Sequence, residues 1–524
     1  MNSNLLRRIK HLQRWESGTI RLLGVIEVLL AGALGFTGAY ALLVGEDAGL
    51  YLYICPIIGI LGLFQLLFFA SKNKLTPALG VLLIAEMWAI SFIVAAIPFM
   101  IYGFSPVDAF FEAISGYTTT GATIVPDLDV LPSSLLLWRG VIQWAGGLTV
   151  LISFSFLLPM IGMGGAGLNS NEFAGSDNDD YSIKISAASL NFIRVYALLT
   201  VMEFVCLLVC NVAPFDSVCI SFSNVPTGGL LPRNDSMASY GMTAQAVTLV
   251  FMILGSANFY MMFRLFFKKD LALLKSRETR IMIEWFLACA LLVFACYMIE
   301  DSGLYNRDNI GETAWVSLYS VISSGTGTGF GIQDFVYPQF IFLVLMIVEF
   351  MGGASGSTAG GIKIHRMMAL KSYVMSNINR VMHPNAVFSI KADGRNLGEE
   401  AVNSALSTIF LFLMGIFISL AILMLIEPDI GQFTPDGVDE LQTYFGVILA
   451  AIANAGIGPM PSYDVLNVGS KLLMCFLMWL GRMEFVLVLI LFTKGFWSDV
   501  RLSVGQFRSS QSKNVLTEKF NRKR

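Results

Sequence analysis

Charged side chains are scarce in this sequence. Asp, Glu, Lys and Arg make up 14% of the residues and hydrophobic residues 55%, whereas an ordinary soluble domain is roughly 25% charged. This composition excludes a soluble body and favours a polytopic α-helical protein of the lipid bilayer. The net charge is −3, and Lys and Arg fall in short clusters between apolar segments. No continuous basic face is formed, so nucleic acid is not an expected partner.

Histidine and cysteine motifs are also few. His11, His365 and His383 all lie in or beside segments that we expect to be cytoplasmic, so no histidine base is buried among the apolar spans. No carboxylate pair, metal cluster or nucleophile motif replaces it. The seven cysteines include no Cys-x-x-Cys pair and indicate packing. The segment IGMGGAG at 161–167 follows no predicted strand, so it is weak as a nucleotide loop. We therefore predict neither an enzyme nor a bound organic cofactor.

Ten apolar runs have lengths close to the roughly 20 residues that a helix needs to cross a bilayer. The basic connections between them fall on the side reached after an even number of crossings, which predicts that both termini are cytoplasmic. The acidic connection around 177–180 neither supports nor refutes this orientation. The runs are 20–43, 50–71, 76–102, 134–160, 188–212, 242–267, 280–300, 337–362, 402–427 and 468–494.

After the first two runs, the same order occurs four times: a long apolar span, a short amphipathic stretch, a glycine-containing turn and another long span. Each short stretch is about half a membrane crossing, so it is expected to enter the bilayer and turn back. These stretches are Pro106–Tyr117, Pro214–Ser223, Glu312–Ser324 and Asp439–Ala453. The turns read TTTGAT (118–123), NVPTGGL (224–230), SGTGTGFG (324–331) and ANAGIGP (453–459).

The four turns predict one shared, water-accessible cavity, because non-helical backbone at membrane depth survives only where it is buried in protein or lines such a cavity. A ring of backbone carbonyls can replace the hydration water of a cation, and glycine permits the required backbone conformations. Short helices ending at the turns add the negative ends of their dipoles, which favours a cation over an anion. Asp127 and Asp129 lie outside the first turn; they either enrich cations locally or are solvated loop carboxylates.

Several segments resemble the TrkH/TrkG/KtrB/HKT superfamily of potassium transporters, and the TrkH branch in particular. The two spans before the first repeat favour that branch. The resemblance covers about residues 20–505 and rests on FFEAISGYTTTGAT (110–123), WRGVIQWAGGLTVLI (138–152), MGGASGSTAGGIKIHR (351–366), ANAGIGP (453–459) and WLGRMEF (479–485).

The resemblance implies a K⁺ selectivity filter with one critical glycine in each repeat. In the second turn Gly229 competes with Gly228 for this place, and in the third Gly327 competes with Gly329. Gly121 favours K⁺ over Na⁺, since family members with serine at this position admit Na⁺ readily. The filter residues implied are Thr119, Thr120, Gly121, Thr227, Gly228, Thr328, Gly329, Ala455 and Gly456.

The glycine-rich run at 352–361 cannot sustain a regular helix cheaply, and it lies deep in the predicted bilayer. It is either a kinked, packed helix or, as the resemblance implies, an intramembrane loop that blocks the permeation path and moves to open it. Arg482 would face the pore beneath the filter and contact this loop. Lys363 either works with the loop or extends to the cytoplasmic surface. The gate residues implied are Gly352, Gly353, Ser355, Gly356, Gly360, Gly361, Lys363 and Arg482.

These predictions describe an all-α membrane protein with four pore repeats around one central pore and two additional N-terminal helices. The expected divisions are 1–75 (N-terminal segment and extra helices), 76–187, 188–279, 280–401 and 402–500 (repeats one to four), and 501–524 (basic tail).

The expected function is K⁺ uptake across the bacterial cytoplasmic membrane, down the electrochemical gradient or coupled to H⁺. The alternatives are a weakly selective Na⁺/K⁺ transporter and a secondary transporter of a small organic solute, which also uses broken helices. The resemblance further implies a homodimer with a cytoplasmic TrkA-type subunit that binds the nucleotide.

Overall fold

The computed structural model confirms the predicted all-α fold. It describes residues 17–69, 77–160, 180–299, 309–332, 337–383, 390–392, 395–434, 438–456, 458, 460 and 462–502. In this part of the chain, the only strands are the two-residue β1 (Lys391–Ala392) and β2 (Arg395–Asn396), which pair antiparallel. The basic segment before residue 17, the Gly-rich segment 161–167, the acidic residues 177–179 and the basic tail beyond residue 502 lie outside the described residues.

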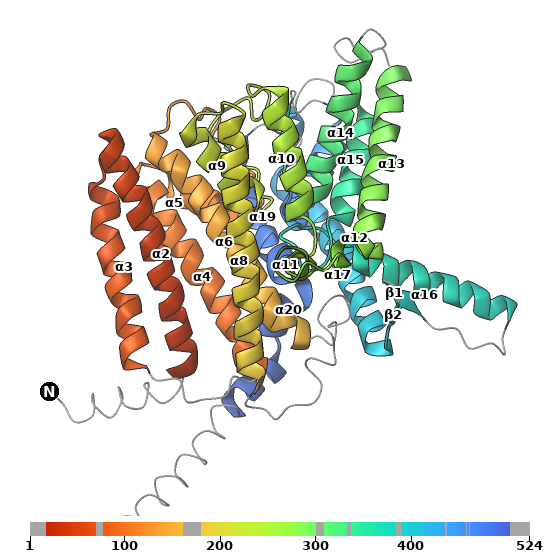
Figure 1. Cartoon of the computed structure of the whole chain (residues 1–524), viewed down its shortest axis with the longest axis horizontal. Helices are drawn as coiled ribbons and strands as arrows, with labels where there is room; N and C mark the ends of the chain where they lie inside the picture. Colours follow the sequence, from red (N-terminus) through yellow and green to blue (C-terminus); the bar gives the residue numbers. More distant parts are fainter. Residues whose placement is uncertain are drawn as a thin grey trace, which may run out of the picture. The chain divides into compact units, whose positions relative to one another are not determined.

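The chain divides into two compact units, one of residues 1–94 with 485–524 and one of residues 95–484. In the first unit, α2 (Ser17–Val44) and α3 (Gly49–Phe68) run side by side (Figure 1). Gln65 of α3 donates hydrogen bonds of 3.0 Å to both carboxylate oxygens of Glu27 on α2. The Cys55 thiol donates to the Ala31 carbonyl oxygen at 3.1 Å. These bonds fasten the two predicted N-terminal spans to each other.

The first two repeats follow the predicted order of helices. Helix α4 (Pro77–Ile101) precedes the short α5 (Pro106–Tyr117) and the long α6 (Ser133–Met160). Helix α8 (Asp180–Val209) precedes the short α9 (Pro214–Asn224), and α10 (Met242–Gly255) and α11 (Phe259–Lys268) follow. The N-cap Ser105 accepts a hydrogen bond of 3.2 Å from the Asp108 backbone and Pro106 occupies the first turn, as this sequence predicts.

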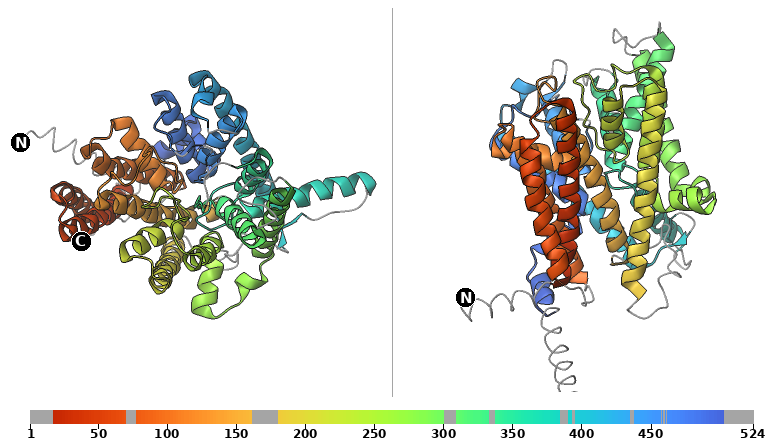
Figure 2. Two further views of the ribbon diagram at one scale, coloured as in Figure 1. Left: turned by 90° about the horizontal axis from the view of Figure 1, so that it is seen from above. Right: turned by 60° about the vertical axis from the view of Figure 1, so that its left-hand side comes forward.

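The third and fourth repeats show the same order of long and short helices. After the short α12 (Ala272–Lys275), the third contains α13 (Arg277–Ile299), α14 (Ile310–Thr326), α15 (Gln339–Met351) and α16 (Ile364–Met382). The fourth contains α17 (Glu399–Ile426), the 3₁₀ turn η2 (Ile430–Phe433), α18 (Glu440–Ala453), α19 (Val468–Met483) and α20 (Phe485–Leu491). Seen along its helices, the unit 95–484 winds in chain order around a common centre (Figure 2).

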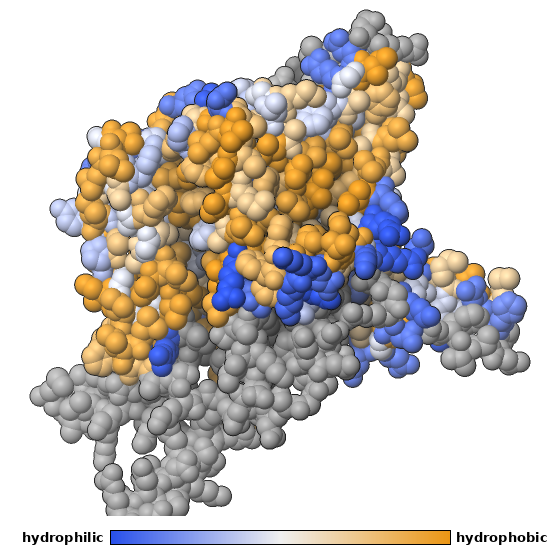
Figure 3. All heavy atoms as spheres, in the orientation of Figure 1, coloured by the Kyte–Doolittle hydropathy of each residue, from blue (hydrophilic) through white to orange (hydrophobic). Residues whose placement is uncertain are grey.

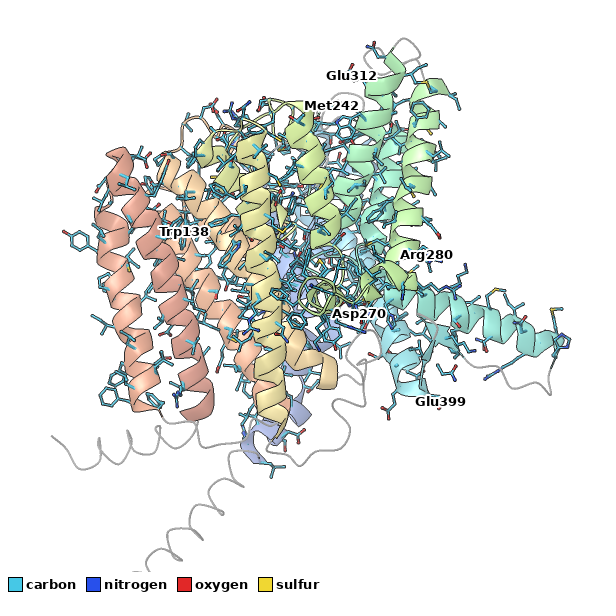
Figure 4. All side chains as sticks on the ribbon, viewed as in Figure 1. Trp138, Met242, Asp270, Arg280, Glu312 and Glu399 are labelled. Carbon is cyan, nitrogen blue, oxygen red and sulfur yellow. The ribbon has the colours of Figure 1, made fainter. Side chains whose placement is uncertain are left out.

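The labelled residues mark the two ends of the unit 95–484. Figure 4 places Met242 and Glu312, near the starts of α10 and α14, at one end of this unit, and Asp270, Arg280 and Glu399 at the other. The space-filling view shows apolar residues along the helices and polar residues around α11 and α12 (Figure 3). Among the described residues, seven helices are long and apolar enough to cross a membrane, or up to nine if each of two broken pairs counts as one. The protein is a multi-pass membrane protein.

Three of the expected spans are not continuous helices. Between α10 and α11 the axis turns by 106°, and Glu484, with φ 71°, separates α19 from α20. The span expected at 337–362 is helical only to Met351, and an irregular segment follows up to Lys363. Such non-helical backbone needs protein partners at this depth.

Candidate functional site

The four turns share a left-handed residue at the same position, and the glycine two positions later has positive φ in the first three turns only (85°, 91° and 79°). In each, a residue in the left-handed region ends the short helix or follows it closely, and a glycine stands two positions later. The pairs are Thr119 (φ 52°) with Gly121, Thr227 (φ 56°) with Gly229, Gly327 (φ 77°) with Gly329, and Asn454 (φ 51°) with Gly456.

Backbone hydrogen bonds support the same alignment. The N–H of the residue before this glycine donates to a carbonyl five positions earlier in three of the turns: Thr120 to Ser115 (2.9 Å), Gly228 to Ser223 (2.7 Å) and Ala455 to Ala450 (3.1 Å). Ser115 and Ser323 also donate their hydroxyls to carbonyls seven positions later, at 2.5 and 2.8 Å. Gly228 therefore stands in the place of Thr120, and Gly229 stands in the place of Gly121.

These glycines meet around a centre. A methyl group built on Gly121 would lie 3.2 Å from the Cα of Gly229, and one built on Gly229 would collide with the carbonyl oxygen of Thr328. One built on Gly329 would lie 2.5 Å from the Cα of Gly456, and one on Gly456 would lie 3.2 Å from the carbonyl oxygen of Thr120. The turns thus form a closed ring in the order one, two, three, four, with no room for larger side chains at its contacts.

A cavity of ≈ 90 Å³ opens on this ring. All four glycines line it, one from each turn, together with residues of the loops that follow the turns. A single cavity shared by four matching turns is what the sequence predicts for a pathway built by the repeats. The described part of the fourth turn extends to Gly456, while Ile457 and Pro459 lie outside the described residues.

Side chains fix the turns from behind. Thr118 and Thr120 share a hydroxyl–hydroxyl hydrogen bond of 2.8 Å, and the equivalent Thr326 and Thr328 share one of 2.9 Å. Asn454 donates to the Thr120 hydroxyl at 3.0 Å and joins the fourth turn to the first. In the second turn, Gln143 of α6 donates to the Gly228 carbonyl oxygen at 2.6 Å. Because these partners are buried, the backbone of the ring is held in one arrangement.

A buried ion pair that is not among the predicted site residues supports the first turn. The Arg139 guanidinium of α6 donates to the Glu112 carboxylate of α5 at 2.7 Å, with exposed side-chain fractions of 2% and 0%. Arg139 also donates to the Thr123 hydroxyl at 2.9 Å and to the Leu231 carbonyl oxygen at 3.2 Å. The signal was present, since a charged residue inside an apolar span calls for a partner.

The loops beyond the turns are joined by polar contacts. Asn234 donates to the Asp127 carboxylate at 2.8 Å and accepts from the Leu128 backbone at 2.7 Å. Hydrogen bonds from Asn234 and from the Asp129 backbone lower the pKa of Asp127 below its ordinary value. Arg233 pairs with Asp216 at 2.8 Å. Asp127 therefore has a structural partner, and enrichment of cations by Asp127 and Asp129 stays a prediction.

The irregular segment between α15 and α16 lies under the ring. Gly361 donates its backbone N–H to the carbonyl oxygen of Ala453, the last residue of α18, at 3.0 Å. Gly352, Gly356 and Gly361 have φ values of 68°, 70° and 73°, a region that only glycine enters easily. Gly353 is packed against the Ala359 side chain and Ser256, the residue after α10, and Gly360 against the backbone of Ala453 in α18, with no space for a Cβ atom at either glycine. This geometry is a loop between two helices and not a kink within one.

Arg482 connects this loop to the first turn. Its guanidinium donates to the Thr118 carbonyl oxygen at 2.5 Å and to the Thr358 carbonyl oxygen at 2.7 Å, and it also bonds the Thr119 hydroxyl. The side chain is buried. A cationic group thus contacts the first turn and the loop at the same time.

Two further charged residues fix the ends of the broken helices. Lys363 is buried, and its ammonium group donates to the Ser357 carbonyl oxygen at 3.3 Å, so it lies within the loop rather than extending to the cytoplasmic surface. Glu484 pairs with Arg366 of α16. Both Lys363 and Glu484 have positive φ, 77° and 71°, immediately before a helix. Such strained backbone in non-glycine residues persists only where surrounding contacts enforce it.

Several glutamates in the apolar spans have no predicted role. One of them, Glu203, joins two helices. It accepts a hydrogen bond of 2.5 Å from Asn224, the last residue of α9. Glu349 is buried on α15, whereas Glu284 is exposed on α13. Nothing in these contacts assigns proton transfer to them.

Four re-entrant helices whose turns meet at one cavity define the pore-loop class of membrane proteins. Residues 95–501 match the family model TrkH, described as a cation transport protein. The chain belongs to the TrkH family.

Curated relatives and a solved structure agree with this assignment. The chain is 28% identical over 493 residues to the Trk system potassium uptake protein TrkH of Salmonella typhimurium, an alignment that covers 91% of this chain and 99% of the relative. It is 30% identical over 428 residues to TrkG of Escherichia coli, covering 80% and 85%. The crystal structure of the potassium transporter TrkH from Vibrio parahaemolyticus matches with a TM-score of 0.80 and 26% identity, covering 93% of this chain and 99% of that one.

Proposed function

We propose that this protein takes up K⁺ across the bacterial cytoplasmic membrane through a selectivity filter made by its four turns. The observation that carries the proposal is the ring in which Gly121, Gly229, Gly329 and Gly456 approach one another. A ring of backbone groups can replace the hydration shell of a cation without adding fixed charge. Helices α5, α9, α14 and α18 end at this ring, so the negative ends of their dipoles favour a cation.

The filter residues are those predicted from the sequence, with Gly229 added in the second turn. Gly228 then has the role of Thr120, Thr328 and Ala455, as the residue before the central glycine. The gate is the loop from Gly352 to Gly361, with Lys363 and Arg482. Supporting this role, the loop lies between α15 and α16 and bonds the end of α18 directly.

The test is uptake of ⁸⁶Rb⁺ into proteoliposomes that contain the purified protein. We expect uptake that excess K⁺ abolishes and that equal concentrations of Na⁺ or amino acids leave nearly unchanged. Equal competition by Na⁺ would replace the proposal with a weakly selective Na⁺/K⁺ transporter. Absence of ⁸⁶Rb⁺ uptake together with uptake of an organic solute would replace it with a secondary transporter. Imposing a pH gradient in the same vesicles separates passive conduction from H⁺ symport.

We also propose the assembly that the family resemblance implies: a homodimer with both termini cytoplasmic and a TrkA-type subunit that carries the nucleotide. The basic residues Lys268, Lys269, Lys275, Arg277 and Arg280 gather around α11, α12 and the start of α13, a suitable face for such a subunit. The repeat boundaries 76–187, 188–279, 280–401 and 402–500, with the N-terminal part at 1–75 and the tail at 501–524, remain predictions.

A further inference from the structure

The break between α10 and α11 and the loop below the ring complete each other's hydrogen bonds. At the end of α10, the carbonyl oxygens of Gly255 and Ser256 lack the helical partners that a continuous helix would provide. The Ala354 N–H of the loop donates to the Ser256 carbonyl oxygen at 2.9 Å. Thr358 donates its hydroxyl to the Gly255 carbonyl oxygen at 3.0 Å and its N–H to the same oxygen at 3.3 Å. The loop is therefore fitted to this break.

One residue of the loop is held from both sides by side chains of other helices. The N–H of Ser355 donates to a carboxylate oxygen of Glu278 at 2.7 Å. Its carbonyl oxygen accepts a hydrogen bond of 2.7 Å from the Asn258 amide. Glu278 is in the first turn of α13 and Asn258 caps α11, accepting from the Met261 backbone at 3.1 Å. The next loop residue, Gly356, accepts a hydrogen bond of 3.1 Å from the Phe259 backbone.

Glu278 is 1% exposed, so its interaction with the loop is made out of contact with bulk water. A hydrogen bond from a backbone N–H to a buried carboxylate is among the stronger kinds in proteins. Burying an acidic group here is costly unless it has such partners. A packing role alone does not explain an acid at this position, whereas its hydrogen bond from the Ser355 N–H of the irregular loop does.

We propose that Glu278 and Asn258 are positioning residues that clamp the loop at Ser355 and keep the pathway closed; this rests on the proposed function of the loop as the gate. The clamp also connects the gate to the basic face, because α12 and the start of α13 carry Lys275, Arg277 and Arg280 beside Glu278. Figure 4 places Arg280 and Asp270 in this region. A subunit that binds this face and shifts the start of α13 would release Ser355.

The experiment is single-channel recording of purified variants, with flux measurements in parallel. Glu278→Ala removes the acceptor and should raise the open probability about tenfold, the equilibrium change expected from loss of one charge-assisted hydrogen bond. Glu278→Gln keeps an acceptor oxygen and should recover most of the wild-type closure. Asn258→Ser keeps a helix cap but is too short to reach Ser355, so it should also raise the open probability. Unitary conductance and the K⁺/Na⁺ permeability ratio should stay at wild-type values.

Glu284→Ala is the matched control, because Glu284 is an exposed acid on the same helix. A loop deletion within 352–361 distinguishes the two levels of the proposal. If the deletion raises flux but Glu278→Ala and Asn258→Ser do not, the clamp is wrong and the gate stands. If the deletion leaves flux at or below wild type, the gate itself is rejected. Should Glu278→Ala fail to give a normal oligomer, Asn258→Ser decides, and a wild-type open probability in that variant rejects the clamp.

Discussion

Replacement of Arg482 tests the proposed pathway most directly, since its guanidinium contacts both a filter turn and the loop. A cation at the level of the ring would be about two residues of extended backbone, roughly 7 Å, from this group. At an effective dielectric constant of about 20, two like charges at that separation repel by about 2 kcal/mol. We therefore expect Arg482→Ala to raise cation flux by roughly thirtyfold if the charge limits permeation.

Two milder variants separate charge from contact. Arg482→Gln removes the charge and keeps hydrogen-bond donors, so the unitary conductance should rise. Arg482→Lys keeps the charge but cannot reproduce the forked contacts with Thr118 and Thr358, so the open probability should rise while the conductance stays near wild type. Single-channel recordings in planar bilayers measure both quantities. A normally assembled Arg482→Ala protein with unchanged conductance and open probability would refute the pore-facing assignment.

Four further variants probe the filter, the gate and the supporting ion pair. Serine at Gly121 or Gly229 should lower the K⁺/Na⁺ permeability ratio, because a side chain collides with the neighbouring turn; an unchanged reversal potential under mixed-ion conditions would remove that glycine from the filter. Shortening the loop at 352–361 should increase ⁸⁶Rb⁺ flux in the absence of any other subunit, whereas a packing kink predicts poor expression and lower flux. Arg139→Met should destabilise the protein by about 3 to 5 kcal/mol, since it leaves the buried Glu112 without its cation; a wild-type thermal unfolding midpoint in detergent would show that the pair contributes little.

The bounds of the short helices could be predicted closely because residues at the helix ends themselves determine where each helix starts and stops. Ser105 and Pro106 suit a helix start, and α5 begins at Pro106 and ends at Tyr117, as expected. The α18 helix likewise differs from the prediction only in that Asp439 is its N-cap. Length, apolar periodicity and turn residues were enough to predict these helices, because all three signals depend only on residues close together in the sequence.

The breaks in the second and fourth repeats were missed because they do not interrupt the apolar run. Met242–Gly255 and Phe259–Lys268 together pass as one span by composition. The signal available was Asn258, a good N-cap residue inside an apolar stretch, but its role depends on the loop at Ser355, distant in sequence. Glu484 offered no such signal, since nothing local favours positive φ in a glutamate.

Which of the two neighbouring glycines in the second turn faces the ring could not be predicted from nearby residues. Gly228 and Gly229 are the same residue type, so only their positions in the ring distinguish them. Gly229 has φ 91° and faces Gly121, whereas the space beside Gly228 is filled by Gln143. Contacts between turns about 100 residues apart decide this, so a single turn could not reveal it.

The ring has a lower symmetry than its four glycines suggest. Turns one and three are opposite each other in the ring and carry paired threonines, Thr118 with Thr120 and Thr326 with Thr328. Turns two and four have Gly228 and Ala455 before the central glycine. Because all four turns belong to one chain, a single substitution changes one quadrant alone. In the proposed filter, one substitution can therefore change the ion preference through a single quarter of the ring, whereas in a channel of four identical subunits it would change all four.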